Sequence, residues 1–390
     1  MQKPTATNIF FLTAGCFLAF FVFGFTDNLK GPTLPAMLAE LNIDYGTGGN
    51  IFFGEYLGFL IATLITGILA DRFGLKLVLL LAGACLVLGV SGYSAFQSAW
   101  LLSGSLFIIG SGLGALELGP NAMIVNLHHE RKALYLNLMA VLHGLGSMLA
   151  PLFAGWLFNL SVSWRVIYRW DLILIAIFVF IFLFLRFPRL QEKTQLNFRE
   201  IPRVAFNDKM PWFYLSIALY VAAEIGTASW LVTFLQKERG LSVTASNQAL
   251  SLFFATIVIG RFLGGFVVHR IGYLRSIFLA SLGAFACMAI GLYGPISLSL
   301  LLPLTGLFLS IIFPTITAAA SDSHTENINT ILGVLFTFAG IGGVVGPWLV
   351  GWSSDLFGLW YGFFINLFLI ALMILSILIL MKGQQHGTNS

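Results

Sequence analysis

Charged residues are scarce in this chain, and their scarcity excludes most classes of water-soluble protein. Only 9% of the 390 residues are charged, whereas 58% are hydrophobic and 15% are aromatic. The mean hydropathy of +0.93 is equally unlike that of a soluble domain, in which about 25% of residues are charged. The net charge of +4 is small and gives no indication of a nucleic-acid partner.

Cysteine pairs and catalytic motifs are also missing. Cys16, Cys85 and Cys287 lie in apolar stretches and form neither a CxxC pair nor a disulfide framework. The sequence has no HExxH metal motif, no GxxxxGKS or GxxxxGKT phosphate loop, and no GxSxG nucleophile elbow. We therefore expect no metal site, no cofactor and no enzymatic activity, and the missing phosphate loop argues against ATP-driven transport.

The chain is rich instead in apolar stretches of about 18–25 residues, each long enough to cross a bilayer core of roughly 30 Å as a helix. They predict an all-α polytopic membrane protein with twelve transmembrane helices, whose direct partner is the lipid bilayer. The predicted helices are 8–38, 47–70, 77–96, 99–127, 133–159, 167–187, 211–236, 244–268, 274–293, 296–319, 329–353 and 358–382.

The longest polar segment divides the chain into two halves. We predict an N-terminal six-helix bundle at 1–187, a cytoplasmic linker at 188–210, and a C-terminal six-helix bundle with a short tail at 211–390. With the N-terminus inside, fourteen Lys and Arg residues fall on the cytoplasmic side and four on the other. This asymmetry predicts a cell (inner) membrane protein with both termini in the cytoplasm.

The two halves repeat each other in sequence. Three motifs recur in the same order at offsets between 194 and 198 residues, which indicates duplication of a six-helix unit. Two parallel repeats predict pseudo-symmetric bundles with a binding cavity at their interface near the membrane midplane. The matched segments are 67–74 with 265–272, 112–120 with 306–314, and 144–156 with 340–352.

The few ionisable side chains inside the apolar stretches are the candidate ion-coupling groups, because lipid makes them costly. We expect this role for Glu117, Asp27 and Glu224, of which Glu224 is the repeat mate of Asp27 at an offset of 197. Desolvation disfavours a charged carboxyl, so such a group can load and release a proton. The alternative is a carboxyl satisfied by a neighbouring donor. Glu55 is a weaker candidate, because it lies nearer the outer end of its helix, where we expect water to reach it.

Lys30 and the asparagines leave the coupling ion open. Asp27 and Lys30 are three residues apart, so they share a helix face and can pair. Such a pair either keeps the carboxylate ionised or acts as a switch. Carboxylate and amide oxygens of Asp27 with Asn28, or of Glu117 with Asn121, also suit a sodium ion. The pattern does not decide between H⁺ and Na⁺.

The segment GILADRFGLK at 67–76 resembles the signature of the major facilitator superfamily between helices 2 and 3. The resemblance covers essentially the whole chain. It implies two bundles that rock about a shared cavity in alternating access. It also implies that the charges of this segment make cytoplasmic contacts that break during transport. The alternative is a motif that only sets topology. The conformational motif residues are Gly67, Asp71, Arg72, Gly74 and Lys76, with Arg270 in the repeat.

Four further segments resemble the fucose–galactose–glucose symporter branch of that superfamily. They are the Asp27-Asn28 pair before Pro32, GALELGPNAMIVNL at 114–127, YLNLMAVLHGLGSMLAP at 135–151, and YVAAEIGTASWLVTFL at 220–235. Carried over by position, Glu117 is the protonatable carboxylate, Asn121 a cavity polar group, and Glu224 and Trp230 cavity residues. The chain departs from the pattern at Ala140, His143 and Lys30. A sodium-dependent glucose branch with a basic residue after its helix 1 Asp-Asn pair keeps sodium coupling open.

We therefore expect a monomeric secondary active symporter for a small polar solute, most simply a monosaccharide. Aromatic rings stack on the apolar faces of sugars, while amides bind their hydroxyls. The alternative is a proton-driven exporter of amphipathic organic compounds, which the 38 phenylalanines favour. A membrane receptor or intramembrane enzyme fits less well. The predicted substrate-binding residues are Asn28, Asn121, Asn137, His143 and Trp230.

Overall fold

A computed structural model describes residues 6–185, 187, 206, 209–322 and 328–387. Within these ranges all regular secondary structure is helical, and twelve helical segments are long and apolar enough to span a membrane. The predicted all-α architecture is confirmed. The chain divides into two compact units, Met1–Thr194 and Gln195–Ser390. Most of the predicted 188–210 linker lies outside the described residues, so its role stays a prediction.

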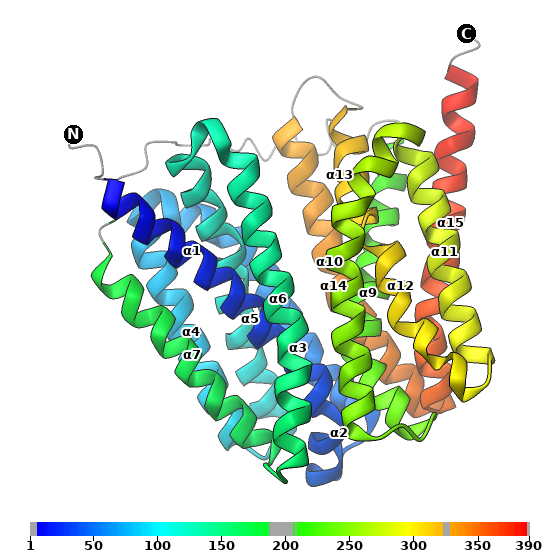
Figure 1. The fold of residues 1–390 in the computed structure, drawn as a ribbon, viewed down its shortest axis with the longest axis horizontal. Coiled ribbons are helices and arrows are strands. Elements are labelled where there is room, and N and C mark those ends of the chain that lie inside the picture. The colour runs from blue at the N-terminus through cyan, green and yellow to red at the C-terminus, as the bar shows by residue number, and fades with distance from the viewer. Residues whose placement is uncertain (1–5, 186, 188–205, 207–208, 323–327, 388–390) are drawn as a thin grey trace. The chain divides into compact units, whose positions relative to one another are not determined.

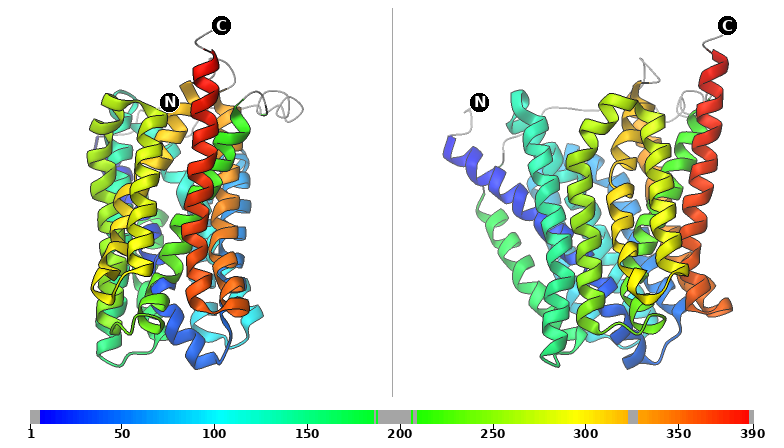
Figure 2. Two further views of the ribbon diagram at one scale, coloured as in Figure 1. Left: turned by 90° about the vertical axis from the view of Figure 1, so that its right-hand side faces the viewer. Right: turned by 45° about the vertical axis from the view of Figure 1, so that its right-hand side comes forward.

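Each unit contains six membrane spans (Figures 1 and 2). The helices of the first unit are α1 (Ala6–Asp27), α2 (Lys30–Leu41), α3 (Tyr45–Phe73), α4 (Leu75–Ala95), α5 (Ala99–Leu127), the 3₁₀ turn η1 (His129–Arg131), α6 (Lys132–Asn159) and α7 (Trp164–Phe184). Those of the second are α9 (Met210–Lys237), α10 (Val243–Ile271), α11 (Tyr273–Tyr293), η2 (Ile296–Leu300), α12 (Leu301–Leu309), α13 (Ile312–Asp322), α14 (Ile328–Phe357) and α15 (Leu359–Gly387).

The two units pack their helices in the same pattern. In the first unit α1 packs on α6 and α7, and α5 packs on α3 and α4. In the second unit α9 packs on α14 and α15 in the same way, and α12 packs on α10 and α11. The duplication seen in the sequence is therefore present in the helix contacts of each unit.

Small residues allow the first and fifth spans of each unit to approach closely. A Cβ added at Gly146 of α6 would collide with the Phe21 carbonyl oxygen of α1. A Cβ added at Gly342 of α14 would collide with the Ala218 carbonyl oxygen of α9. Gly146 and Gly342 are repeat mates, so the duplicated glycine preserves one backbone contact in both units, as small residues commonly do in membrane helix pairs.

Two predicted helices are interrupted in the structure. The stretch expected as one helix at 8–38 is divided at Asn28-Leu29, where α1 ends and α2 begins. Pro32 explains the break, because it has no N–H for the Asn28 carbonyl and its ring crowds that carbonyl. The stretch expected at 296–319 likewise divides at Ser310-Ile311, four residues before Pro314. The expected continuity was wrong at both places.

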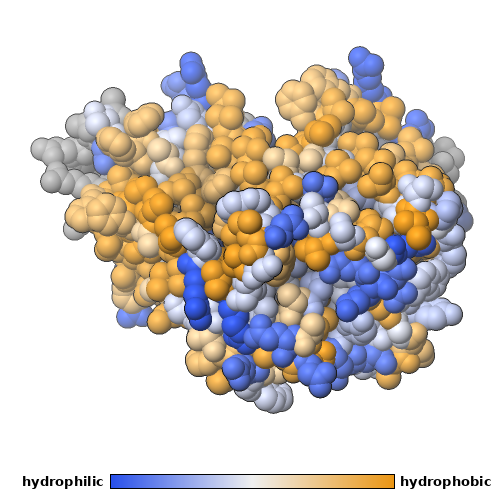
Figure 3. Space-filling model, turned by 60° about the horizontal axis from the view of Figure 1, so that its bottom comes forward, coloured by the Kyte–Doolittle hydropathy of each residue, from blue (hydrophilic) through white to orange (hydrophobic). Residues whose placement is uncertain are grey.

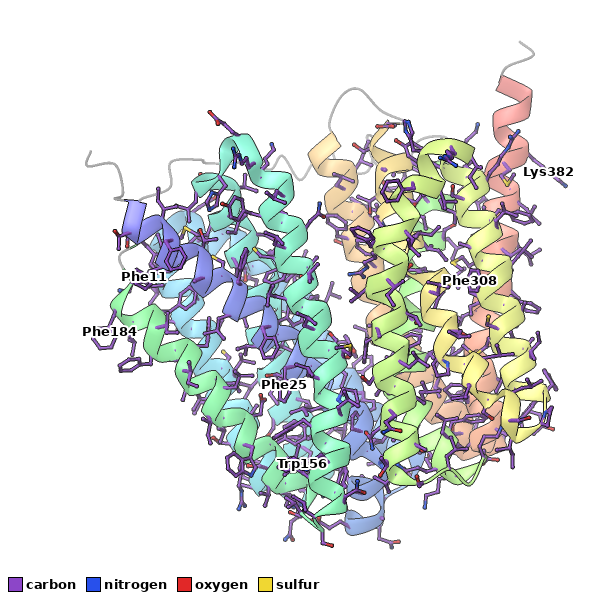
Figure 4. The ribbon with its side chains drawn as sticks, viewed as in Figure 1. Phe11, Phe25, Trp156, Phe184, Phe308 and Lys382 are labelled. Atoms are coloured by element: carbon purple, nitrogen blue, oxygen red, sulfur yellow. The ribbon has the colours of Figure 1, made fainter. Side chains whose placement is uncertain are left out.

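Apolar side chains cover the flanks of the helices, as a lipid-facing surface requires. Phe184 projects away from α7 with 72% of its surface exposed, and Phe11 of α1 is 52% exposed (Figure 4). Figure 3 shows hydrophobic side chains along the helix flanks and hydrophilic ones gathered at the end turned towards the viewer. This distribution fits helices that lie in lipid along their length and meet water at their ends.

The glycine contact gives a test of the packing. We expect Gly342→Ala to lower the free energy of unfolding by about 1–3 kcal/mol, because the added methyl group overpacks the α9–α14 contact. The measurement is the thermal unfolding midpoint in detergent. Gly333→Ala is the matched control in the same helix, since nothing lies within 4 Å of its added Cβ. An equal effect of both substitutions would contradict the packing argument.

Candidate functional site

The most densely charged buried site among the described residues of the first unit surrounds Lys30, the first residue of α2. Its side chain is only 4% exposed. The ammonium Nζ lies 2.5 Å from Oδ1 of Asp27 and 2.9 Å from Oε2 of Glu55. It also lies 4.3 Å from the centre of the Tyr56 ring. We call Asp27, Lys30 and Glu55 the ionic triad.

The triad confirms one prediction and corrects another. Asp27 and Lys30 pair as their spacing predicted. Glu55 was expected near water at the outer end of its helix, but it is 2% exposed and lies against the same ammonium. That expectation was wrong because the position of a residue along its helix does not tell which neighbouring side chains cover it. The break between α1 and α2 is what places Lys30 between α1 and α3.

The energetics of the triad follow from its burial. An isolated charge in an apolar interior is very costly, whereas a paired and hydrogen-bonded one is tolerated. Lys30 offsets one carboxylate charge completely and interacts with the second. The ring face of Tyr56 adds a cation–π contact. The three helices α1, α2 and α3 are therefore joined through one ammonium group.

Asn28 holds the interrupted end of α1 against α6. Its side-chain amide donates to the Gly24 carbonyl at 2.8 Å and to the Ser147 hydroxyl at 3.0 Å. Asn28 is 8% exposed. The structure therefore shows a structural use for this amide, and its predicted contact with substrate stays a prediction.

Asp171 of α7 is a buried carboxyl that the sequence analysis overlooked. Its Oδ1 accepts a hydrogen bond from the Thr26 hydroxyl at 3.1 Å, and the residue is 1% exposed. Its Oδ2 is buried without a hydrogen-bond partner among the described residues. The signal was available, because Asp171 is an acidic residue inside the apolar stretch predicted at 167–187. Through its hydrogen bond Asp171 lies beside Thr26, the residue that precedes Asp27 in the chain.

Glu117 and Asn121 lie one turn apart on α5, as predicted. Asn121 donates its side-chain amide to the Glu117 backbone carbonyl at 2.7 Å. Both side chains are partly buried. Glu117 is not among the groups that act on Lys30, so the structure does not bring it into the ionic triad. Its coupling role stays a prediction.

The two predicted substrate residues of α6 have different surroundings. The His143 ring packs edge-on against Phe23, with ring centres 4.6 Å apart, and lies 6.4 Å from Phe20. Asn137, almost two turns earlier, is exposed. His143 is thus a polar group set among phenylalanines, and neither residue belongs to the triad.

In the second unit, Glu224 of α9 lies within the electrostatic influence of a basic residue. The charge of Arg261 on α10 acts on its carboxyl, and Tyr220 lies one turn earlier on α9. Arg261 was not predicted as a site residue, although it stands inside a predicted transmembrane stretch and the same rule would have found it. Both units therefore place a basic residue near a carboxyl of their first span.

Trp230 is completely buried in the second unit. Its indole N–H donates to the Pro347 carbonyl of α14 at 2.9 Å, and none of its surface is exposed. This contact joins α9 to the proline of α14. The predicted stacking of Trp230 on a sugar stays a prediction, since the structure shows the indole N–H used within the protein.

The motif at 67–76 forms a tight turn in both repeats. Gly74 has φ +84° and its mate Gly272 has φ +83°, a backbone conformation that favours glycine. The Gly74 N–H donates to the Ala70 carbonyl at 2.8 Å. No atom lies within 4 Å of a Cβ added at Gly67. Three further charged residues of the motif and its repeat are exposed: Asp71, Arg72 and Arg270.

Lys76 of this motif binds the end of α7. Its ammonium donates to the carbonyls of Leu183 at 2.8 Å and Leu185 at 2.9 Å. These carbonyls belong to the last turn of α7, where the helix offers no N–H partner and its dipole is negative. Lys76 thereby joins the turn between α3 and α4 to the sixth span of the same unit.

His128, at the end of α5, packs against two other helices. Its Nε2 lies 2.7 Å from the Thr13 hydroxyl of α1, and its ring stacks on Tyr135 of α6 at 3.6 Å. Burial lowers the pKa of His128, because desolvation disfavours the imidazolium. The residue is a packing group at the edge of the membrane span.

Among the described residues there is no cluster of His, Cys, Asp and Glu that could hold a metal ion.

Comparison with known proteins identifies the family. The model of the Major Facilitator Superfamily matches residues 16–302 and 249–389. The chain belongs to this superfamily, a family of transporters and not of enzymes, and it is a multi-pass membrane protein.

The chain is similar to several characterised or solved members. A glucose/galactose transporter of Brucella abortus is 26% identical over 93% of this chain and 92% of its own length. The glucose/mannose transporter GlcP of Bacillus subtilis is 24% identical over 86% of each. The solved structure of the nucleoside transporter NupG matches with a TM-score of 0.81, 15% identity and coverage of 96% of this chain and 99% of that one.

A solved structure of the E. coli fucose:proton symporter FucP matches with a TM-score of 0.63 and 21% identity, and the match covers 94% of this chain and 97% of that one. The fold expected from the sequence is thereby confirmed, and the curated relatives named here are sugar transporters. The family resemblance was carried by short motifs such as the one at 67–76, whereas the matches extend over nearly the whole chain.

The triad gives a stability test. We expect Lys30→Met to lower the free energy of unfolding by about 3–5 kcal/mol, because it leaves two buried carboxyls without their cation. Adding Glu55→Gln to Lys30→Met should recover part of the loss, since one of the two uncompensated groups is then neutral. The check is thermal unfolding of the single and double variants. Additive losses would show that Lys30 and Glu55 do not interact.

Proposed function

We propose that this protein is a secondary active transporter that moves a monosaccharide by proton- or sodium-coupled symport. The single observation that supports this most directly is the ionic triad inside a membrane span. Ionisable groups are kept there at a cost and serve ion pathways in transporters. Membership of the superfamily and the sugar-transporter names of the relatives support the same proposal.

Acidic side chains of each unit take part in ion coupling in this proposal. Glu117 and Asp27 couple ion and substrate binding, and Glu224 assists from the second unit. Reciprocal linkage requires that each ligand increases the affinity for the other. The transporter needs no cofactor besides the coupling ion.

Sugar recognition is assigned to polar and aromatic groups on the three spans that carry these carboxyls and on α6. Amide and imidazole groups bind hydroxyls, and an indole ring packs on the apolar face of a pyranose. The transporter works as a monomer in the cell (inner) membrane with both termini in the cytoplasm, and the 67–76 motif supports alternating access. The proposed sugar-binding residues are Asn28, Asn121, Asn137, His143 and Trp230.

One observation favours a second candidate, the export of amphipathic organic compounds driven by protons. The ring of His143 lies among phenylalanines of α1, and Phe23 also approaches Phe59 of α3 with ring centres 6.1 Å apart. An aromatic surface of this kind suits a partly apolar solute. The same carboxyls would serve either function.

A flux measurement separates the candidates. Purified protein in proteoliposomes is offered labelled glucose, galactose, mannose, fucose and a nucleoside under an imposed pH gradient or sodium gradient. We expect at least one hexose to accumulate above equilibrium under one gradient, and protein-free liposomes are the control. Proton-driven efflux of hydrophobic cations without any hexose flux would favour the exporter and contradict the sugar proposal.

The role of Glu117 gives a further prediction. Glu117→Gln should abolish ion-driven accumulation and leave some sugar exchange, because the amide keeps the shape but cannot carry the coupling charge. The measurement compares gradient-driven uptake with exchange in sugar-loaded vesicles. Glu130→Gln, at an exposed acid after the same helix, is the matched control. Full accumulation by Glu117→Gln would remove Glu117 from the mechanism.

A further inference from the structure

The ionic triad holds two carboxyl groups against one ammonium group. Oδ1 of Asp27 lies 2.5 Å and Oε2 of Glu55 lies 2.9 Å from Nζ of Lys30. Two carboxylates that share one buried site repel each other, which disfavours ionisation of both at once. The geometry therefore favours a proton on one of the two.

The charge balance of the site leads to the same conclusion. Two carboxylates and one ammonium leave one negative charge, and one proton makes the triad neutral. The side chains of Lys30 and Glu55 are 4% and 3% exposed, so the extra charge has little water to stabilise it. The charged groups that act on Glu55 are Lys30 and Asp27.

The other helices around the triad add no compensating cation within the described residues. The titratable groups that face it are the phenols of Tyr56 on α3, Tyr93 on α4 and Tyr168 on α7. Asp171 of α7 accepts a hydrogen bond from the hydroxyl of Thr26, which precedes Asp27 in the chain. Arg165, at the start of α7, is 2.7 Å from Glu40 and is paired there.

We propose that Asp27 and Glu55, held by Lys30, form the binding site of the coupling ion and that this ion is a proton. The proposal rests on the ion-coupled transport proposed above and names its ion and its residues. The Lys30 ammonium occupies the position between the carboxyls that a sodium ion would take, so the remaining charge is left to a proton. A proton from water on one side binds a carboxylate oxygen and leaves to water on the other side, with no other bond changed.

The position of the triad connects proton binding to the backbone. Asp27 is the last residue of α1, Lys30 is the first of α2, and the break lies between them. Loss of the proton places a second negative charge beside the first, within one contact network that joins α1, α2 and α3. Asp27, with 15% of its side chain exposed, is the most accessible member of the triad, and in this proposal the proton enters and leaves through it.

The test variant is Glu55→Gln, which leaves the balanced Asp27–Lys30 pair and removes the need for a proton. One pH unit sustains about a tenfold sugar ratio for one proton per sugar, and we expect this ratio to fall to about one in the variant. Exchange of sugar between the two sides should continue. Asp27→Asn, the second variant, should give the same separation of accumulation from exchange. Glu238→Gln, at an exposed acid after α9, is the control.

A second measurement needs no substrate. Infrared difference spectra of the protein in lipid should show the C=O band of a protonated carboxyl that shifts in D₂O and is lost in Glu55→Gln.

The identity of the ion is tested by sugar uptake. Uptake by the unmodified protein should depend on a pH gradient and should not respond to a sodium gradient. Full pH-driven accumulation by Glu55→Gln, a missing band, or sodium-driven uptake would overturn the proposal. If no sugar moves at all, the proposed function fails, and the infrared band alone supports or overturns the proton site.

Discussion

Every backbone polar group placed inside lipid must find its partner within the chain, and most of this structure follows from that constraint. The backbone is satisfied by forming helices throughout the described spans. Where a helix is interrupted or ends, side chains supply the missing partners. Asn28 bonds to Gly24 and Ser147 at the break after α1, and Lys76 binds the last carbonyls of α7. Lys30 and its two carboxyls satisfy the same requirement for charge.

The fold could be predicted from the sequence because the lengths of apolar stretches and the spacing of the repeats carry most of the necessary information. The break at Asn28 could not be read from hydropathy, since an apolar stretch looks the same whether or not the helix is continuous. Proline alone is not decisive either, because Pro151 and Pro347 lie inside helices that continue. Local packing decides which prolines interrupt a helix.

The site was harder to predict than the fold. The spacing of Asp27 and Lys30 predicted their contact, because neighbours on one helix are fixed by local geometry. The contact of Lys30 with Glu55 joins two spans and depends on how α2 turns, which no local pattern encodes. Asp171 and Arg261 are a different case, since both interrupt apolar stretches and were overlooked.

Duplication preserved the helix framework but not the charges. The contact of Gly146 with α1 recurs at Gly342 with α9, and the turns at Gly74 and Gly272 have the same backbone conformation. The neighbours of the first-span carboxyl differ between the units. Asp27 has Lys30 and Glu55 near it, whereas Glu224 has Arg261 and Tyr220.

The burial of Lys30 also has a consequence for biosynthesis. A lysine at the centre of a helix costs about 2.5–3.5 kcal/mol to insert into a membrane, and Asp27 reduces that cost within the first span. Since Glu55 belongs to the next span, the first two spans lower each other's insertion cost most when they leave the translocon together as a hairpin.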